Sequence, residues 1–421
     1  MNNVVLAYEK IDKNTLCGWN YNGRIEPSSI PLTTDSMDML MNNSFMLDLY
    51  NTLVIPDPNT KFPGMFRNVP PDYKPTVKQI DEIGDEKYVY LLEISNNWVL
   101  TQLSHYAISE KVLSDVRAGQ AYIVLAYHHE GDLGGNPYFL RSLVNNLNVP
   151  KEQIFLLHGD YDVEKYKDEP YTYVPLNCVI HWVQEFQRDK LIDYVPDKLF
   201  TCYNRQTRPH RIVMLSLLNQ YSLIERGIVS CGPGLLNDKK PLKDILENIL
   251  QRSVTYNDLQ FFNAISNSSP DDLNLGIDNP ATNMVEEHYR HSFVSVINET
   301  LTNSIFFTEK IYKPILIGHP FLLMGAPNQL AKLREQFGFK TFGQWWDESY
   351  DQIDDMHLRA KRIVDILVSL NSKTEQELID IREEMKPTLK YNQNLYNSIV
   401  ANNMYGSEKP IWNFLHKLFN P

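Results

Sequence analysis

Short apolar runs alternate with segments of helical periodicity along most of this chain, and this alternation is the feature that most constrains its fold. Strands are predicted at residues 87–94, 121–127, 153–162, 178–186, 199–204, 227–232, 293–297 and 321–324. Helical patterns lie between or after them, at residues 102–117, 138–148, 212–221, 242–252, 328–336 and 355–386. Because strands that alternate with helices pair in parallel, the sequence predicts an α/β fold with doubly wound sheets.

The length of 421 residues exceeds what one hydrophobic core usually holds together, so two domains are expected. We predict an N-terminal Rossmann-like domain over 1–195, in which 1–85 is irregular. A second Rossmann-like domain is predicted over 196–370, followed by a helical tail over 371–421. The tail is amphipathic and is expected to cross back to the first domain.

Charge and cysteine usage narrow the class of protein. The net charge of −12 and a pI near 5.4 disfavour a broad nucleic-acid surface. No apolar run approaches the roughly 20 residues of a membrane span, so none is expected. The four cysteines are scattered without a CxxC pair, which is typical of a reducing compartment. We therefore expect a cytoplasmic protein.

The segment 293–323, FVSVINETLTNSIFFTEKIYKPILIGHPFLL, concentrates polar chemistry between two apolar strands. Asn298, Glu299 and Thr300 follow the first strand, where a parallel sheet places its ligands. Thr308 is predicted to cap a helix that begins with Glu309 and Lys310 and carries Lys313 one turn later. A helix N-terminus with lysines suits a diphosphate, and the carboxylate of Glu309 suits sugar or ribose hydroxyls.

A second basic segment, RQTRPHR at 205–211, lies between a predicted strand and a predicted helix. Arg205, Arg208 and Arg211 place three guanidinium groups within seven residues, and guanidinium groups match the geometry of phosphate oxygens. Arg211, close to the start of the helix, is the strongest candidate. The alternative is a solvated basic loop or an ion pair between domains.

These two segments together resemble the signature of the α-1,3-fucosyltransferase family, over roughly residues 198–345. Thr308, Glu309 and Lys310 match its Thr-Glu-Lys, and Arg211 stands in the place of its phosphate-binding arginine. The resemblance implies a GT-B architecture, in which two Rossmann-like domains face each other across a cleft. It also implies an inverting, metal-independent transfer of a sugar from a nucleotide-sugar donor to a glycan or another hydroxyl acceptor. No cofactor is expected.

The family resemblance also implies which residues contact the donor. The sequence differs from the family's pattern at two points. By carry-over, Arg211 and Lys310 bind the diphosphate, and Glu299 and Glu309 contact ribose and sugar. Asn298 and Glu299 stand in the reverse order of the family's Glu-Asn pair, so the nucleotide and the sugar stay open. Pro314 lies inside the predicted helix and is expected to kink it. The segment GFKTFGQWWDESYD is similar to uncharacterised phage and bacterial proteins that carry the same core.

An inverting transferase needs a base for the acceptor hydroxyl, expected at the end of a strand of the first domain. The segment HHEGDLGG at 128–135 offers Glu130, which we prefer, or Asp132. The alternative is that Glu130 caps the next helix or pairs with a nearby histidine.

Other functions remain open at this point. Asp160 and Asp162 form the Asp-x-Asp motif of manganese-dependent GT-A transferases. His288 and His291 have the spacing of a zinc pair, but no third ligand is evident. A phage-type DNA-base glycosyltransferase and a non-catalytic nucleotide- or carbohydrate-binding protein are the remaining alternatives.

Overall fold

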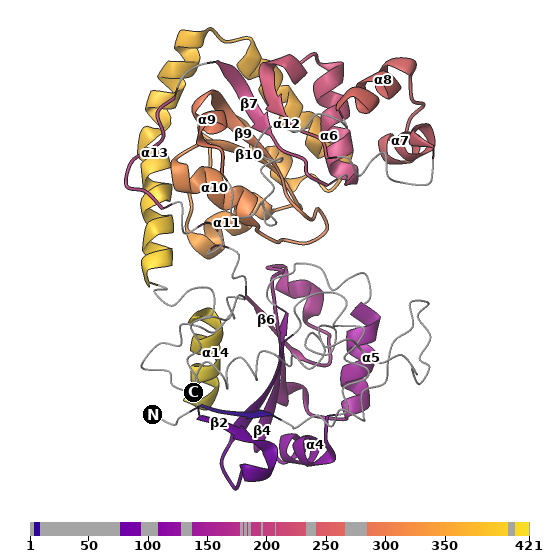
Figure 1. Ribbon diagram of the computed structural model, residues 1–421, viewed down its shortest axis with the longest axis vertical. Coiled ribbons are helices and arrows are strands. Elements are labelled where there is room, and N and C mark those ends of the chain that lie inside the picture. The colour runs from indigo at the N-terminus through magenta and orange to yellow at the C-terminus, as the bar shows by residue number, and fades with distance from the viewer. Residues whose placement is uncertain are drawn as a thin grey trace, which may run out of the picture. The chain divides into compact units, whose positions relative to one another are not determined.

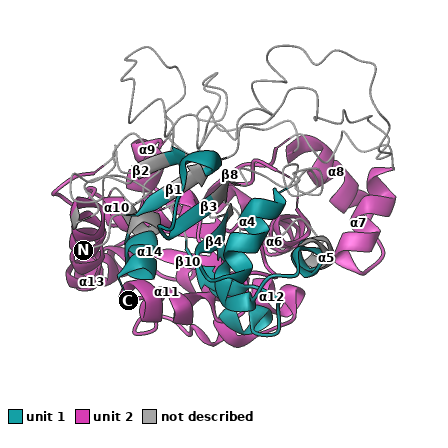
Figure 2. Cartoon of the chain, turned by 90° about the horizontal axis from the view of Figure 1, so that it is seen from below, with its two compact units in different colours: residues 1–178, 403–421 teal, residues 179–402 magenta. Residues whose placement is uncertain are grey.

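The computed structural model describes residues 4–8, 76–93, 108–127, 137–176, 180, 183, 187–194, 197–206, 208–232, 241–265, 284–402 and 409–420. Two compact units divide the chain, residues 1–178 with 403–421 and residues 179–402 (Figure 2). The sequence predicted the first boundary at 195/196. Each unit has its own parallel sheet with helices packed on it, which confirms the α/β prediction.

The sheet of unit 1 has six strands in the order β2-β1-β3-β4-β5-β6, and all neighbours are parallel. The strands are β1 Val5–Tyr8, β2 Thr76–Gln79, β3 Tyr88–Glu93, β4 Ala121–Tyr127, β5 Ile154–His158 and β6 Thr172–Pro175. Its α-helices are α4 Glu110–Arg117, α5 Pro137–Leu147 and α14 Lys409–Phe419, and its 3-10 helices are η3 Ile80–Glu82, η5 Lys151–Gln153 and η6 Val163–Tyr166. Helices α4 and α5 lie on one side of the sheet and α14 on the other (Figure 1).

Three of the six strands of unit 1 follow the sequence prediction, whereas β1 and β2 fall within residues 1–85, which were wrongly expected to be irregular. Strand β4 has the predicted bounds, and β3 and β5 fall within theirs. The segment 178–186, expected to be a strand, falls mostly outside the described residues. The edge strand β6 was missed because it is short, half-buried and ends in Pro175, which suits an edge position.

The sheet of unit 2 has four parallel strands in the order β10-β9-β7-β8. The strands are β7 Lys198–Cys202, β8 Gly227–Val229, β9 Ser292–Asn298 and β10 Phe321–Met324. The α-helices are α6 Pro209–Gln220, α7 Leu242–Leu250, α8 Tyr256–Ile265, α9 Glu286–Arg290, α10 Glu309–Ile317, α11 Gln329–Phe337, α12 Met356–Asn371 and α13 Glu375–Asn402, with 3-10 helices η8 Ile224–Arg226 and η12 Ser349–Gln352.

Unit 2 is doubly wound. From β7 the chain crosses through α6 to β8, and from β9 it crosses through α10 to β10 in the opposite direction along the sheet. Because such crossovers are right-handed, the two helices cover opposite faces. Figure 1 shows α10 and α13 on one side of this sheet and α6 and α12 on the other. Every residue of β9 is buried, as expected for a central strand covered on both faces.

Helix α10 has defined ends and continues through Pro314 instead of stopping there. At its C-terminal end, His319 N donates to Pro314 O (2.8 Å) and Gly318 N donates to Ile315 O (3.3 Å). This Schellman arrangement needs a positive φ, which is 72° at Gly318. Among the described residues, no helix combines the length and apolar character that crossing a membrane requires.

Candidate functional site

The strand order of unit 2 reverses between β7 and β9, and this reversal defines the candidate site. The two strands are paired neighbours, and the chain leaves their carboxyl ends toward α6 and α10, which cover opposite faces. In doubly wound sheets, ligands bind in the crevice outside the carboxyl ends of the strands at such a switch point. Both basic segments singled out in the sequence begin here.

A buried asparagine ties the ends of three strands together. Asn204 follows β7, and its Nδ2 donates to Ser230 O (3.1 Å), just beyond β8. Its Oδ1 accepts from Asn298 Nδ2 (2.9 Å), at the end of β9. Gly232 N donates to Asn204 O (2.6 Å), and a Cβ on Gly232 would lie 1.6 Å from Arg205 O. Only glycine therefore fits at position 232.

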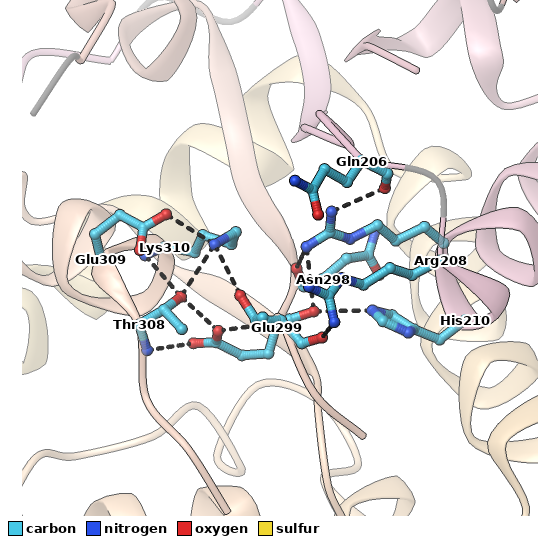
Figure 3. A network of polar contacts seen from close by, with 10 residues as sticks. Gln206, Arg208, His210, Asn298, Glu299, Thr308, Glu309 and Lys310 are labelled. Carbon is cyan, nitrogen blue, oxygen red and sulfur yellow. Dashed lines mark hydrogen bonds and ion pairs between the residues drawn. The ribbon is translucent and has the colours of Figure 1, made fainter. Parts of the chain in front are cut away.

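Basic side chains from the N-cap and first turn of α6 reach across to the segment that follows β9 (Figure 3). Arg208 Nη1 donates to Thr300 O (2.8 Å), and His210 Nε2 donates to Glu299 O (2.8 Å). Arg211 Nη2 donates to Asn298 O (3.2 Å) and Glu299 O (3.3 Å), and its Nη1 donates to Gln206 O (2.9 Å). These bonds fix the geometry of both loops relative to each other.

Burial sets the protonation of two of these side chains. It lowers the pKa of His210 to about 3, helped by the charge of Arg211, so the imidazole is neutral and Nε2 carries the proton that it donates. Burial and the neighbouring Arg208 lower the pKa of Arg211 to about 10, so its guanidinium is still charged at neutral pH. The site thus keeps a buried positive charge beside the end of β9.

The carboxylate of Glu299 accepts hydrogen bonds from both ends of the segment that joins β9 to α10. The side chain is fully buried, and its Oε1 accepts from Thr308 N (3.1 Å). Its Oε2 accepts from Thr308 Oγ1 (2.5 Å) and Thr300 N (3.2 Å). Burial raises the pKa of Glu299, although the nearby Lys310 opposes this shift. Both oxygens are engaged inside the protein, so the side chain positions Thr308 at the start of α10.

Thr308 caps α10 as the sequence predicted, since its hydroxyl accepts from Lys310 N (3.4 Å). Lys310 Nζ donates to Thr300 Oγ1 (3.2 Å), to Thr308 Oγ1 (3.2 Å) and to Glu309 Oε1 (2.7 Å). Burial opposes the ionisation of Glu309, but the charges of Lys310 and Lys313 outweigh it and hold its pKa below the usual range. A charged carboxylate and a half-exposed ammonium group therefore stand side by side at the helix start.

The structure brings together most of the residues predicted for the site. Arg211, in the first turn of α6, and Lys310, in the first turn of α10, are about a hundred residues apart in the sequence, yet both bond to the three-residue segment 298–300. Lys313 lies one turn into α10, and Arg205 is exposed in the β7–α6 loop. Glu130 and Asp132, the candidate bases, lie outside the described residues.

Several residues of the site were not assigned a role by sequence reasoning. Asn204, Ser230 and Gly232 all lie within a few residues of a strand's carboxyl end, which is the signal that could have identified them. Two buried atoms in this network, Asn298 Oδ1 and Arg211 Nε, have no hydrogen-bond partner among the described residues. One is an acceptor and the other a donor, so each is available to a water molecule or a ligand.

The two alternative metal sites, Asp160 with Asp162 and His288 with His291, lack the geometry of a metal-binding group in the described residues. Asp160 is buried, and its carboxylate accepts from Asp162 N (2.9 Å), Lys165 Nζ (2.9 Å) and Tyr166 OH (3.1 Å). The Asp-x-Asp segment is thus closed on itself by a turn and an ion pair. In the part of the chain that the structure describes, no group of three or more His, Cys, Asp or Glu side chains is placed to hold a metal ion. The His288 and His291 pair therefore belongs to no such group among these residues.

The site as a whole has the chemistry of an anion-binding site. Helices α6 and α10 both begin at it, and Arg205, Lys310 and Lys313 add positive charge at or near its surface. Comparisons of the chain with protein-family models, with curated proteins and with solved structures find no match.

Proposed function

We propose that this protein is a glycosyltransferase that moves a sugar from a nucleotide-sugar donor to an acceptor hydroxyl. In this proposal the switch point of unit 2 binds the donor, and unit 1 supplies the acceptor side, as in a GT-B enzyme. The observation that carries the proposal is the convergence of Arg211 and Lys310 on residues 298–300 at that switch point.

The diphosphate is the leaving group, and its developing negative charge has to be stabilised in the transition state. We assign direct contact to Lys310, Lys313 and Arg205, together with the first amides of α10. Arg211 donates to three carbonyl oxygens and Arg208 to one, so they hold the two segments in register and contribute charge. Lysine and arginine side chains thus provide the neutralisation that other transferase classes obtain from a cation, which supports a metal-independent reaction.

The two carboxylates of the site are given different roles. Glu309 is ionised beside Lys310 and stays partly exposed, with 15 % of its side chain accessible, so it can accept from hydroxyls of the ribose or the sugar. Glu299 is sealed inside the protein and acts as a positioning residue for Thr308 and α10. Glu130, or Asp132 in its place, is proposed as the base that accepts the proton of the acceptor hydroxyl in an inverting displacement.

Cys202, in strand β7 of unit 2, is a buried free thiol. Free thiols are typical of reducing compartments, which supports a cytoplasmic location. The acidic net charge favours a glycan or another small hydroxyl acceptor over nucleic acid.

The test is release of nucleoside diphosphate from a panel of UDP-, GDP- and dTDP-sugars. The full chain is expected to hydrolyse at least one donor slowly, also in excess EDTA. Lys310→Ala is expected to slow release tenfold or more, about 1.4 kcal/mol in the barrier. Lys332→Ala is the matched control, because Lys332 is 30 % exposed and ion-paired to Glu335, as Lys310 is 29 % exposed and paired to Glu309.

Other outcomes separate the alternatives. Complete loss of turnover in EDTA would favour a manganese-dependent reaction through Asp160 and Asp162. Donor binding without turnover, unaffected by Glu130→Ala and Asp132→Ala, would identify a non-catalytic binding protein. Equal rates for the Lys310→Ala and Lys332→Ala proteins would contradict the proposal.

A further inference from the structure

A pocket in unit 2 has an aromatic wall. Its volume is about 280 Å³, and it lies between the segment 345–350 and helix α12. Trp345, Trp346 and Tyr350 provide the aromatic side chains that line it. The two indoles pack against Phe342, with ring centroids 6.1 Å and 5.3 Å away, so the wall is held in place from behind.

This pocket is separate from the candidate donor site. Phe342, which supports the indoles, packs against Phe321 at the first position of β10 (5.0 Å between ring centroids). Asn371, at the end of α12, accepts from Arg226 Nε (2.8 Å), directly before β8. The pocket therefore lies toward the amino ends of the strands, whereas the donor site lies at their carboxyl ends.

Charged side chains of both signs surround the aromatic wall. Arg362 and Lys373 line the pocket together with Asp347 and Asp365. Asp347 accepts from Ser349 N (2.9 Å) and Ser349 Oγ (2.8 Å), which lowers its pKa and keeps it charged. Asp365 pairs with Lys361. The two carboxylates repel phosphate groups, and the balance of charges gives no net preference for an anion or a cation.

We infer that this pocket binds a neutral saccharide. A sugar ring has an apolar face that packs on indole, and hydroxyl groups that both donate and accept hydrogen bonds. The carboxylates provide acceptors, while Arg362, Lys373 and Ser369 provide donors. The volume is near the lower end of the range for small-molecule sites, about 300 to 1,000 Å³, which suits a mono- or disaccharide.

Saccharide binding in this pocket does not depend on nucleotide-sugar binding at the switch point, because none of the donor-site residues lines the pocket. The indole N–H of Trp346 also has no acceptor among the described residues.

Saturation-transfer NMR with maltose, lactose, N,N′-diacetylchitobiose and methyl α-mannoside tests the inference on the full chain. Ser369→Phe fills the pocket from α12, and Trp345→Ala removes part of its wall. Val368→Phe is the matched control, because Val368 is the neighbouring exposed residue of α12 and does not line the pocket. At least one sugar is expected to bind saturably, with affinity reduced tenfold or more by Ser369→Phe and by Trp345→Ala and unchanged by Val368→Phe.

Three results would overturn the inference: no sugar binds, Ser369→Phe leaves sugar binding unchanged, or adenosine binds in the pocket while the sugars do not. Nucleoside diphosphate titrations on the same proteins keep the two sites apart. Sugar binding that survives Lys310→Ala supports this pocket whether or not nucleotides bind at the switch point.

Discussion

At the scale of single residues, the most consequential contact is the one between Glu299 and Thr308. A threonine at a helix start normally uses its hydroxyl to cap the helix, and here the same hydroxyl also donates to a fully buried carboxylate. The pair joins the end of β9 to the start of α10. The position of Lys310 at the site therefore depends on two residues that need not touch a ligand.

Thr308→Ala removes both the cap and a donor to a buried carboxylate. We expect a loss of about 2 to 4 kcal/mol in the free energy of unfolding, measured by urea titration, because a cap contributes about 1 kcal/mol and an orphaned buried acceptor about 1 to 3. Thr308→Ser should recover most of it. Thr374→Ala removes a comparable Thr–Glu pair at the exposed start of α13 and should have a smaller effect. Equal losses for Thr308→Ala and Thr374→Ala would show that burial of Glu299 is unimportant.

Two buried histidines of unit 2 predict its acid sensitivity. Burial lowers the pKa of His210 and of His319 to about 3. An unfolded histidine titrates near 6.5, so between these values the unfolded state binds more protons and stability falls as pH falls. Each histidine contributes about 1.4 kcal/mol per pH unit in that window. Above about pH 6.5 this contribution to stability is fully present.

His319→Gln should therefore flatten the pH dependence of unfolding by up to about 1.4 kcal/mol per pH unit between about pH 6 and about pH 5. An unchanged slope in His319→Gln would mean that His319 is protonated in the folded state.

At the scale of secondary-structure elements, helix α11 shows what local sequence does not reveal. Asparagine is a common capping residue, so Asn328 is the cap that local sequence predicts; that prediction is wrong, because Asn328 has a φ of 62° and its side chain makes no capping bond. Asp351, about twenty residues further on, accepts from Leu330 N (2.9 Å) and Ala331 N (3.1 Å) instead. The sequence around a helix start contains no signal for a capping residue that is distant in the chain.

Asp351→Ala is expected to destabilise unit 2 by about 1 to 3 kcal/mol, because two amides at the start of α11 lose their acceptor. Asn328→Gly should change the free energy of unfolding by less than about 0.5 kcal/mol, since glycine accepts a positive φ without strain. Chemical denaturation of both variants measures the difference. A larger loss in Asn328→Gly would restore Asn328 as the cap.

The difference between local and long-range contacts explains which parts of the fold and the site the sequence could predict. Strands β4, β9 and β10 and the cap at Thr308 were predictable because apolar runs and capping residues are local signals. The arrangement of the site was only partly predictable. The sequence located Arg211 and Lys310, but not that Arg211 would donate to the carbonyls of Asn298 and Glu299, because that bond depends on which strands are neighbours.

At the scale of the whole molecule, the C-terminal residues 403–421 belong to the same compact unit as residues 1–178. Helix α14 belongs to unit 1, where Phe414 packs on Phe155 (5.2 Å between ring centroids) and Phe419 on Tyr122 (6.3 Å). The sequence had placed an amphipathic tail in this part of the chain and expected it to cross back. Helix α13, which the sequence assigned to the same tail, belongs to unit 2.

Phe419→Ala should destabilise unit 1 by about 3 kcal/mol, because it deletes a buried aromatic ring. Amide hydrogen exchange should accelerate in β4 and β5 and stay unchanged in β7 and β9. Lys417→Ala, on the exposed side of α14, is the control. Uniform acceleration across both units would contradict the assignment of α14 to unit 1.

Calorimetric titration measures whether the switch point of unit 2 binds a nucleoside diphosphate. UDP, GDP and dTDP would be titrated into the full chain, with the matching monophosphates for comparison. We expect that at least one diphosphate binds more tightly than its monophosphate, and that Lys310→Ala weakens its binding at least tenfold while Lys332→Ala does not. Absence of binding by every diphosphate, or equal affinity in the two lysine variants, would contradict this expectation.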